Sequence, residues 1–386
     1  MDLFKKLNDF ILTITSRNEN FWEQRKLLKV CKKEDNKRIP IKEQERKEGN
    51  TPYFGANGIQ GYIDGYTHDG TNILIAEDGA NNVKNYPIKL ITGKIWVNNH
   101  AHVLNVNTKT NNGNFLVGAI KKINFYRYLV GSSRYKLTAE SLSQVKIEIT
   151  EQSEQEKIGE LFKSIEELLT LYERKIKLFD DMIAYLKQQL FYKQSSLSFP
   201  QSHWKDIAFS KLYIKRKDKN IDASYDQSKT ISVANMKYSD RELNSSREYL
   251  KTYYITHFGD IIYEGNRSGN FKYGRFVQNN IGDGIVSHVF TVYKPINDLD
   301  INFMNNFINY EPIMSRVLLY ATTDTLMMHT LHDNELMKQK LSLPDKETQI
   351  KIGKILSLVS TIKNRFSERK ELLIKIKNTL LNTMFI

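Results

Sequence analysis

The sequence is poor in cysteine and has no long apolar run. Cys31 is the only cysteine, so a disulfide framework and a cysteine-based zinc site are excluded. No stretch of about 20 apolar residues is present, so no membrane-spanning helix is expected. The first residues, MDLFKKLNDF, lack the apolar core and the small-residue cleavage site of a secretory signal. We therefore expect a protein of the reducing cytoplasm.

Signatures of catalysis are also missing. The chain has no GxxxxGK[ST] phosphate loop and no Asn/Asp-Pro-Pro-aromatic motif of amino-methyltransferases. The spacing of Gly55, Gly58 and Gly61 does not fit a dinucleotide-binding fingerprint. Pro344-Asp345 followed by Glu368–Lys370 imitates a nuclease pattern. Its second half lies more than about 20 residues along an expected helix, roughly 30 Å away, too far for shared metal coordination. We predict no catalytic residue.

Two histidines, His100 and His102, flank Ala101 in the segment VNNHAHV. Side chains at positions i and i+2 of a strand project to one face, where a pair of imidazoles could hold a metal ion. No Asp, Glu or Cys stands near them in the sequence to complete a site. We therefore predict no metal site and expect the two histidines to make polar contacts.

The abundant features are positive charge and tyrosine. The net charge is +13, the pI is about 9.3, and the chain contains 21 Tyr. Contacts of Lys and Arg with phosphates give strong, salt-sensitive binding, so a polyanion is a plausible partner. A basic protein encoded by an AT-rich genome would have a similar composition, so charge alone does not decide between these explanations.

The chain repeats itself without gaps at a shift of 194 residues. The segment Val145–Phe191 recurs as Gln339–Phe385. Four residues of the first copy, Gln155, Lys157, Ile158 and Gly159, are identical to Gln349, Lys351, Ile352 and Gly353. Because the shift is about half of the chain length of 386, the sequence is one unit written twice. A chain of this length fits two domains.

Each copy ends in a heptad pattern that predicts a long helix. In the first copy, expected to be helical over about 153–191, the seam is formed by Ile165, Leu169, Tyr172, Ile176, Phe179 and Ile183. In the second copy it is formed by Val359, Phe366, Leu373 and Leu380, with Lys363, Lys370 and Lys377 along one edge. Neither helix should be stable alone in water, so we expect the two to pack, antiparallel, on each other. Thr150 stands where the second copy has Pro344, so the first helix is expected to start later.

The remaining sequence of each copy predicts a globular domain of mixed α/β structure. Residues 72–76, 88–91 and 95–97 resemble short strands, and residues 303–308 resemble a helix. The fold class is therefore α+β, with two globular domains joined by two long coiled-coil helices. We place the first domain at 1–150, the first helix at 151–194, the second domain at 195–344 and the second helix at 345–386. Gln194–Ser202 is expected to be a linker.

Both domains contain polar and basic residues among aromatics, which is typical of nucleic-acid binding. Asn and Gln can pair with adenine edges, and Lys and Arg can reach phosphate or guanine. Lys215, Arg216 and Lys217 are more consistent with positioning the DNA backbone than with reading bases. The candidates are Tyr53, Asn57, Lys94, Asn98, Asn99, His100, Arg127 and Arg134 in the first domain, and Lys215, Arg216, Lys217, Arg267, Lys272 and Arg275 in the second.

These segments resemble a known family. Thr51–Asn82 (TPYFGANGIQGYIDGYTHDGTNILIAEDGANN) and Ile95–Leu104 (IWVNNHAHVL) are similar to the target recognition domains of type I restriction–modification specificity subunits. Tyr135–Leu142 with Gln152–Phe191 resembles the central conserved region of that family, and Gln339–Phe385 its distal one. Tyr273–Phe290 (YGRFVQNNIGDGIVSHVF) is similar to one type of second recognition domain. The resemblance covers essentially the whole chain.

The resemblance implies a non-catalytic, sequence-specific DNA-binding subunit. Its two recognition domains would read the two halves of an asymmetric, gapped site in double-stranded DNA. The helix pair would dock two methyltransferase subunits, which supply the S-adenosylmethionine chemistry and flip an adenine. This chain itself would bind no cofactor. Motor and nuclease subunits would join for cleavage.

Two other classes of function remain open from the residues alone. The first is a catalytic DNA enzyme, a nuclease or methyltransferase fused to recognition domains, against which the missing catalytic motifs argue. The second is an adaptor that pairs its coiled coil with partner helices and binds protein. Salt distinguishes the adaptor from a DNA binder, because DNA affinity falls steeply as salt rises.

Overall fold

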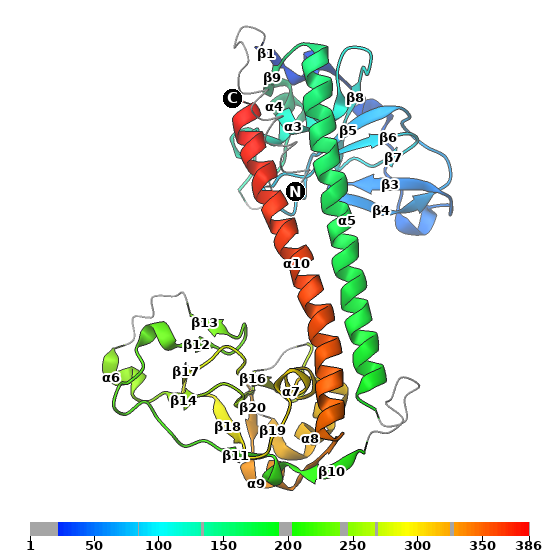
Figure 1. Ribbon diagram of the computed structural model, residues 1–386. Coiled ribbons are helices and arrows are strands. Elements are labelled where there is room, and N and C mark those ends of the chain that lie inside the picture. The colour runs from blue at the N-terminus through cyan, green and yellow to red at the C-terminus, as the bar shows by residue number, and fades with distance from the viewer. Residues whose placement is uncertain are drawn as a thin grey trace. The chain divides into compact units, whose positions relative to one another are not determined.

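The computed structural model divides into two compact units. It describes residues 22–83, 85–132, 135–192, 203–239, 246–266, 269–324 and 328–385. Unit 1 comprises Met1–Arg174 and Ser367–Ile386, and unit 2 comprises Lys175–Phe366. Each long helix contributes one part to each unit, and Figure 1 shows both helices with the elements around them. The expected linker Gln194–Ser202 lies outside the described residues.

Unit 1 is built on two β-sheets, one of them fully antiparallel, and a short strand pair. The four-stranded sheet has the order β2 (Cys31–Lys33), β8 (Ala101–Val106), β5 (Thr71–Ala76), β6 (Ile88–Thr92). The second sheet has the order β4 (Gly58–Ile63), β3 (Thr51–Gly55), β7 (Trp96–Val97), with β3 and β7 parallel. β1 (Glu23–Lys26) pairs with β9 (Lys146–Ile149). The strands expected at 72–76 and 88–91 are confirmed, and the one at 95–97 is shortened to Trp96–Val97.

Short helices surround these sheets. They are α2 (Leu27–Val30), α3 (Gly113–Lys121) and α4 (Ala139–Gln144), with 3-10 turns η2 (Asp35–Lys37), η3 (Glu43–Glu45) and η4 (Phe125–Tyr128). Helix α3 begins where the Asn112 side chain accepts hydrogen bonds from the backbone amides of Asn114 and Phe115. This cap satisfies amide donors that a helix N-terminus otherwise leaves unpaired.

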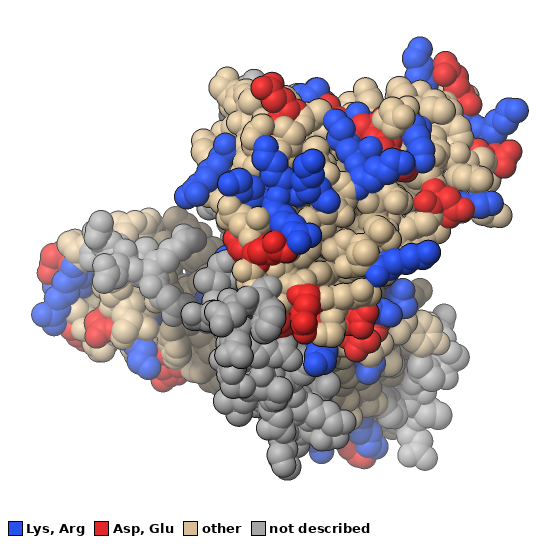
Figure 2. All heavy atoms as spheres, turned by 90° about the horizontal axis from the view of Figure 1, so that it is seen from above, with Lys and Arg blue, Asp and Glu red and all other residues tan. Residues whose placement is uncertain are grey.

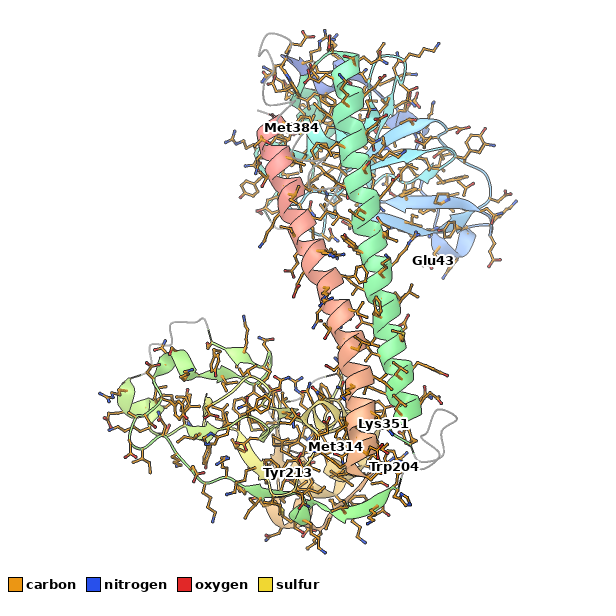
Figure 3. All side chains as sticks on the ribbon, viewed as in Figure 1. Glu43, Trp204, Tyr213, Met314, Lys351 and Met384 are labelled. Carbon is orange, nitrogen blue, oxygen red and sulfur yellow. The ribbon has the colours of Figure 1, made fainter. Side chains whose placement is uncertain are left out.

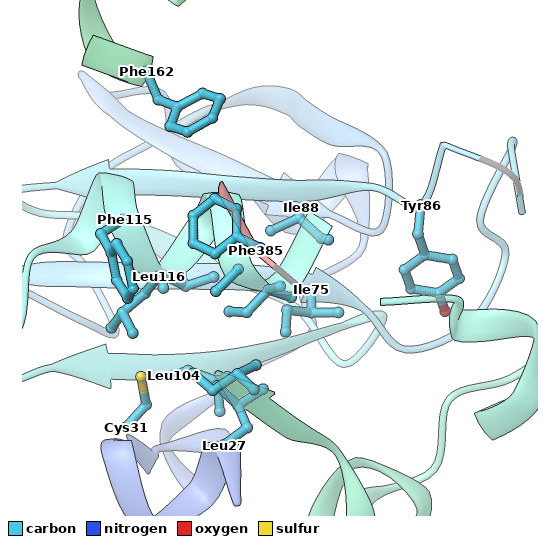
Figure 4. Close-up of a cluster of buried hydrophobic side chains, with 14 of the residues drawn as sticks. Leu27, Cys31, Ile75, Tyr86, Ile88, Leu104, Phe115, Leu116, Phe162 and Phe385 are labelled. Carbon is cyan, nitrogen blue, oxygen red and sulfur yellow. The ribbon is translucent and has the colours of Figure 1, made fainter. Parts of the chain in front are cut away.

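The core of unit 1 is closed by the end of the second long helix. Figure 4 shows Phe385 among the buried side chains of the strands and of α3. Its ring centroid lies 5.2 Å from that of Phe115, 5.9 Å from that of Phe162 and 6.1 Å from that of Trp22. Phe385 is only 1% exposed, and burial of an aromatic side chain of this size stabilises the fold by about 2–3 kcal/mol.

Unit 2 repeats the plan with more and shorter strands. Its four-stranded antiparallel sheet has the order β11 (Tyr213–Lys215), β18 (Thr291–Pro295), β15 (Ile261–Glu264), β16 (Arg275–Gln278). Four strand pairs surround it: β10 (Lys205–Ala208) with β21 (Lys340–Leu343), β12 (Ile231–Ser232) with β13 (Lys237–Tyr238), β14 (Tyr254–Thr256) with β17 (Gly284–Val286), and β19 (Thr322–Asp324) with β20 (His329–Leu331).

The helices of unit 2 are α6 (Arg247–Leu250), α7 (Ile301–Phe307), α8 (Glu311–Ala321) and α9 (Asp333–Lys338), with 3-10 turns η5 (Phe209–Lys211) and η6 (Gln227–Lys229). The helix expected at 303–308 is therefore confirmed. Helices α7, α8 and α9 pack against the four-stranded sheet, and α6 packs against the β14–β17 pair. Tyr213 and Met314, labelled in Figure 3, belong to the buried core, and Phe191 closes it with ring contacts to Phe303 and Phe307. Phe191 and Phe385 thus play matching roles in the two units.

The long helices are α5 (Gln152–Leu190) and α10 (Lys346–Met384), each of 39 residues. They run antiparallel within each unit. In unit 1, Lys377 pairs with Glu166 at 2.6 Å and Lys370 with Glu173 at 2.9 Å. In unit 2, Lys363 pairs with Asp180 at 2.8 Å, and the rings of Phe179 and Phe366 stack at 5.7 Å. The ten seam residues named from the heptad pattern are all buried or half-buried.

One expectation about these helices was wrong. The first helix does not start later than the second, because Gln152 and Lys346 are separated by the same 194 residues as the rest of the repeat. Thr150 replaces the missing proline as a boundary residue, since its hydroxyl donates to the Glu154 carboxylate at 2.9 Å across the first turn. Among the described residues, no helix is long and apolar enough to cross a membrane.

Candidate nucleic-acid interface

The β3–β4 hairpin presents exposed side chains on its β4 strand. Ile59 and Tyr62 on β4 are 48% and 58% exposed, and Gln60 between them is exposed as well. The turn requires Gly58, whose φ of 128° is unfavourable for any residue with a Cβ. A two-stranded ribbon of this kind fits the major groove of duplex DNA. The sequence reading had not singled out Gln60 as a binding residue.

Amide side chains hold this hairpin to the loops beside it. Asn98 is 4% exposed, donates to the Gln60 Oε1 atom at 3.2 Å and accepts the His100 backbone amide at 2.9 Å. Asn57 accepts from the Asn81 amide and donates to the Gly79 carbonyl. Because the side-chain oxygen of Gln60 accepts from Asn98, the other polar atom of this side chain is the amide nitrogen, which can only donate. Asn57 and Asn98 therefore position loops, whereas Asn99 is exposed.

The candidates Tyr53, Lys94 and Arg127 have different environments. Tyr53 is 1% exposed, its hydroxyl is within hydrogen-bond distance of the Ile41 backbone, and its ring packs under the Arg46 guanidinium at 4.0 Å. It therefore supports the hairpin from inside. Lys94 is exposed, with its ammonium 4.5 Å above the ring of Tyr66. Arg127 is exposed on η4, and Arg134 lies outside the described residues.

Beneath this surface lies a buried charged network. The His102 side chain is 1% exposed, with Nδ1 at 2.7 Å from Asp35 and Nε2 at 2.8 Å from the Leu137 carbonyl. Glu77 accepts from Arg38 at 2.7 Å and pairs with Lys136 at 3.0 Å. Both ring nitrogens of His102 lie within hydrogen-bond distance of oxygen atoms.

The network determines the charge of its carboxylates. Burial acts to raise the pKa of Asp35, but hydrogen bonds from His102 and the Val103 amide, with the charges of His102 and Arg38, outweigh it and lower that pKa. Burial also acts to raise the pKa of Glu77, but hydrogen bonds from Arg38 and Lys136 outweigh it, so this pKa is lowered too. Asp35, Glu77 and His102 have the composition of a metal site, yet both nitrogens of the imidazole are engaged in hydrogen bonds.

His100 and His102 do not act together. His100, half-exposed, places Nδ1 at 2.5 Å from Asp78, whereas His102 contacts Asp35 inside the domain. The expectation of separate polar contacts is therefore confirmed for this pair.

In unit 2 the basic run 215–217 is divided between structural and exposed roles. Arg216 is 13% exposed and holds Asp260 through two contacts, at 2.7 and 3.2 Å, with a further contact to Asp218 at 2.9 Å. Burial acts to lower the pKa of Arg216, but the hydrogen bonds to Asp260 and the negative charge of that residue outweigh burial and raise the pKa. Lys215 pairs with Asp333 at 2.6 Å. Lys217 is the exposed member of the three.

The second basic group of unit 2 lies around β16. Arg275 pairs with Glu264 at 2.7 Å and lies 5.2 Å above the ring of Phe271. Lys272 is exposed, with its ammonium 5.3 Å from the ring of Tyr273. Arg267 lies outside the described residues.

Exposed lysines over tyrosine rings are common to both units. Lys219 lies 5.6 Å from the ring of Tyr254 and Lys229 lies 4.9 Å from that of Tyr238, as Lys94 lies over Tyr66. Such contacts hold a cation at the surface, where it can meet a phosphate. Neither Lys219 nor Lys229 was among the candidates named from the sequence. Tyr254 belongs to β14 and Tyr238 to β13, and the fold brings each of these rings close to its lysine.

Further basic side chains lie on β1 and β9 of unit 1. Figure 2 looks onto the end of unit 1 that carries these strands in Figure 1, and Lys and Arg side chains gather on this face. Lys26 and Lys146, which face each other in the strand pair, are both exposed. The surface suits a polyanion.

Asp345, from the nuclease-like pattern, has a structural role. Its carboxylate accepts the backbone amides of His203 and Thr348, both at 2.9 Å, at the start of α10. These hydrogen bonds, that from His203 first, lower the pKa of Asp345. The prediction of a helix boundary at this position is confirmed.

Comparison with known proteins gives the family. Residues 19–178 match the model of the type I restriction modification DNA specificity domain. A putative type I restriction enzyme specificity subunit of Haemophilus influenzae is 31% identical over 343 residues, which cover 86% of this chain and 86% of that protein. The fold is similar to that of the crystal structure of a type I restriction-modification system S subunit from M. genitalium, with a TM-score of 0.69, 17% identity and coverage of 96% and 97% of the two chains. The chain therefore belongs to the family of type I restriction–modification specificity subunits, and its expected fold class and DNA specificity follow from that membership.

Proposed function

We propose that this chain reads an asymmetric, bipartite DNA site, one half with each unit. The observation that supports this proposal is that one repeated structural framework holds a different set of exposed side chains in each unit. The framework repeats at 194 residues, down to the helix boundaries. Unit 1 presents the β4 hairpin with Lys94 over Tyr66, whereas unit 2 presents Lys219 and Lys229 over other tyrosines. Two unlike readers select two unlike half-sites, whereas identical ones would select a palindrome.

The long helices are proposed to dock two methyltransferase subunits. Away from the seam, α5 exposes Leu178 and Tyr185 at 66% and 53%, and α10 exposes Leu358 at 62%. Exposed apolar side chains in a row on a helix are typical of surfaces that receive partner helices. In this proposal the partners bind S-adenosylmethionine and flip the adenine, and this chain binds no cofactor. Motor and nuclease subunits join for cleavage.

The proposal is tested with the chain alone and with its partners. The purified chain, incubated with plasmid, magnesium and S-adenosylmethionine, should neither methylate nor nick DNA. Co-expressed with a type I adenine methyltransferase subunit from the same genome, the chain should yield methylated adenines in one gapped, non-palindromic motif on sequencing of the methylome. Methylation or nicking by the chain alone, or a palindromic motif, would refute the proposal.

A salt series separates this function from that of a protein adaptor. Affinity for duplex DNA should fall linearly on a log-log plot, with a slope of about −0.9 per phosphate neutralised. An adaptor would bind its protein partner with little dependence on salt and would not retain the duplex at low salt.

A further inference from the structure

A hollow of about 440 Å³ lies in unit 2, apart from the basic run of β11. One wall is the loop Phe271–Tyr273, which contributes two aromatic rings and Lys272. Leu319 near the end of α8 and Thr322 also line the hollow, and Asp324 and His329 on the β19–β20 hairpin supply polar groups. The volume is large enough for one flat heteroaromatic ring with a substituent.

The walls of this hollow are held by contacts outside it. The Tyr263 hydroxyl donates to the Tyr273 carbonyl at 2.8 Å, and the Lys272 amide donates to the Glu311 carboxylate at 3.1 Å. The Arg275 guanidinium lies over the Phe271 ring, 5.2 Å from its centroid. Because these contacts form without a ligand, the site is pre-organised, and little conformational entropy is lost when it is filled.

His329 provides an unsatisfied polar atom at this hollow. The residue is 7% exposed, and its Nδ1 atom has no hydrogen-bond partner among the described residues. The Asp324 carboxylate oxygen is 3.4 Å away, outside hydrogen-bond geometry. A buried polar atom without a hydrogen-bond partner destabilises the fold, so a ligand that bonds to it gains free energy.

We propose that this hollow binds a nucleobase. The ring stacks on the Phe271 and Tyr273 side, the hydrogen-bonding edge meets His329 and Asp324, and Lys272 meets the phosphate. Stacking of a base on an aromatic side chain is favourable for any base. The hydrogen-bonding edge of the base determines which base binds. The Asp324 carboxylate accepts from the exocyclic amine of adenine or cytosine and repels the carbonyls of thymine.

The base comes either from a free nucleotide or from a strand of the bound DNA. Displacing a base from a duplex breaks its pairing and stacking, and stacking in the hollow with the new hydrogen bonds would offset that cost. The DNA source rests on the function proposed above, whereas the nucleotide source does not, so two experimental arms distinguish them.

The first arm uses the full chain with mononucleotides. The chain has 8 His, so NMR spectra of histidine-labelled protein resolve the His329 ring. Titration with AMP or CMP should shift that signal, and TMP should bind at least tenfold more weakly. In the second arm, duplexes with 2-aminopurine at successive positions of the methylated motif should show fluorescence enhancement at one position when the chain binds.

A filling variant and a matched control locate the effect. Leu319→Trp, at a position that is 47% exposed, should fill the hollow without unfolding the domain and abolish both signals. Tyr320→Trp, at the next position of α8 and 68% exposed, does not line the hollow and should leave both unchanged. Thermal melts of both variants should match that of the wild type.

Each outcome decides the proposal. A shift of His329 with AMP or CMP, or a 2-aminopurine signal lost in Leu319→Trp, supports it and names the source. If the duplex binds in a gel-shift assay but neither arm responds, the nucleobase site is refuted and the DNA-reading function stands. If the duplex does not bind, the proposed function fails, and the nucleotide arm alone then supports or overturns the site.

Discussion

The side-chain carbonyl of Gln155 accepts a hydrogen bond from the backbone amide of Asn112 at 3.1 Å. Gln349 makes the same bond to the Asp300 amide at 3.0 Å in the other unit. Each glutamine also donates back to a carbonyl before its own helix, Thr150 at 2.7 Å and Pro344 at 2.9 Å. The two glutamines thus lock the cap of a domain helix onto a long helix in both units, which explains why the repeat keeps them.

Removal of this lock should destabilise each unit by itself. In Gln155→Ala, a half-buried amide and a buried carbonyl lose their partner, which should cost about 2–4 kcal/mol in free energy of unfolding. Gln349→Ala should cost a similar amount, and the two effects should add because the sites share no partner. Urea unfolding measures both. Gln188→Ala, on the exposed face of α5, is the control and should change stability by less than about 0.5 kcal/mol.

The buried network of unit 1 makes its stability sensitive to acid. The pKa values of Asp35 and Glu77 lie below their ordinary values of 3.8 and 4.5. A lowered pKa in the folded state stabilises the protein above the unfolded value, and this contribution is lost as the pH falls through the folded value. Unfolding midpoints in urea should therefore drop as the pH is lowered from about 5 to about 3. Asp35→Asn should flatten that drop, and Asp181→Asn, on the exposed face of α5, should not. An equal drop in Asp35→Asn and in the wild type would contradict the role of the network.

Arg216 and Lys217 should separate stability from DNA binding. Arg216→Ala leaves Asp260, which is 1% exposed, without its cation and should cost about 3–5 kcal/mol in stability. Lys217→Ala should leave the melting temperature unchanged, weaken binding to all duplexes alike, and reduce the salt slope by about 1. The adjacent positions serve as controls for each other. Equal melting temperatures for the two variants would show that the Arg216 ion pair is not structural.

Paired deletion of one heptad should change the gap of the recognised site. Because α5 and α10 are antiparallel, removing 172–178 together with 366–372 keeps their seam in register. Seven helical residues span about 10 Å, or about three base pairs of duplex. Methylome sequencing should return the same two half-sites with a shorter gap. An unchanged gap would show that the helices do not set the spacing, and deletion from one helix alone should unfold the pair.

Local patterns predicted the helices well and the binding residues less well. The heptad seam and the repeated Gln155 and Gly159 are local patterns, each recognisable within one stretch of the sequence. Both long helices could therefore be placed within a few residues. The role of Arg216 depends on Asp260, 44 residues away, and no spacing rule connects the two. Tyr53 has the sequence context of a contact residue, but strand pairing turns it inward. The importance of Gln60 emerges only when the hairpin brings it to Asn98.

The most direct test of two independent readers is the methylome of a hairpin variant. Ile59→Ala, Gln60→Ala and Tyr62→Ala, combined, alter only exposed side chains of β4 in unit 1. The variant, expressed with its methyltransferase partner, should relax or change one half of the methylated motif and leave the other half and the gap intact. A change in both halves, or a motif identical to that of the wild type, would contradict the assignment of one half-site to each unit.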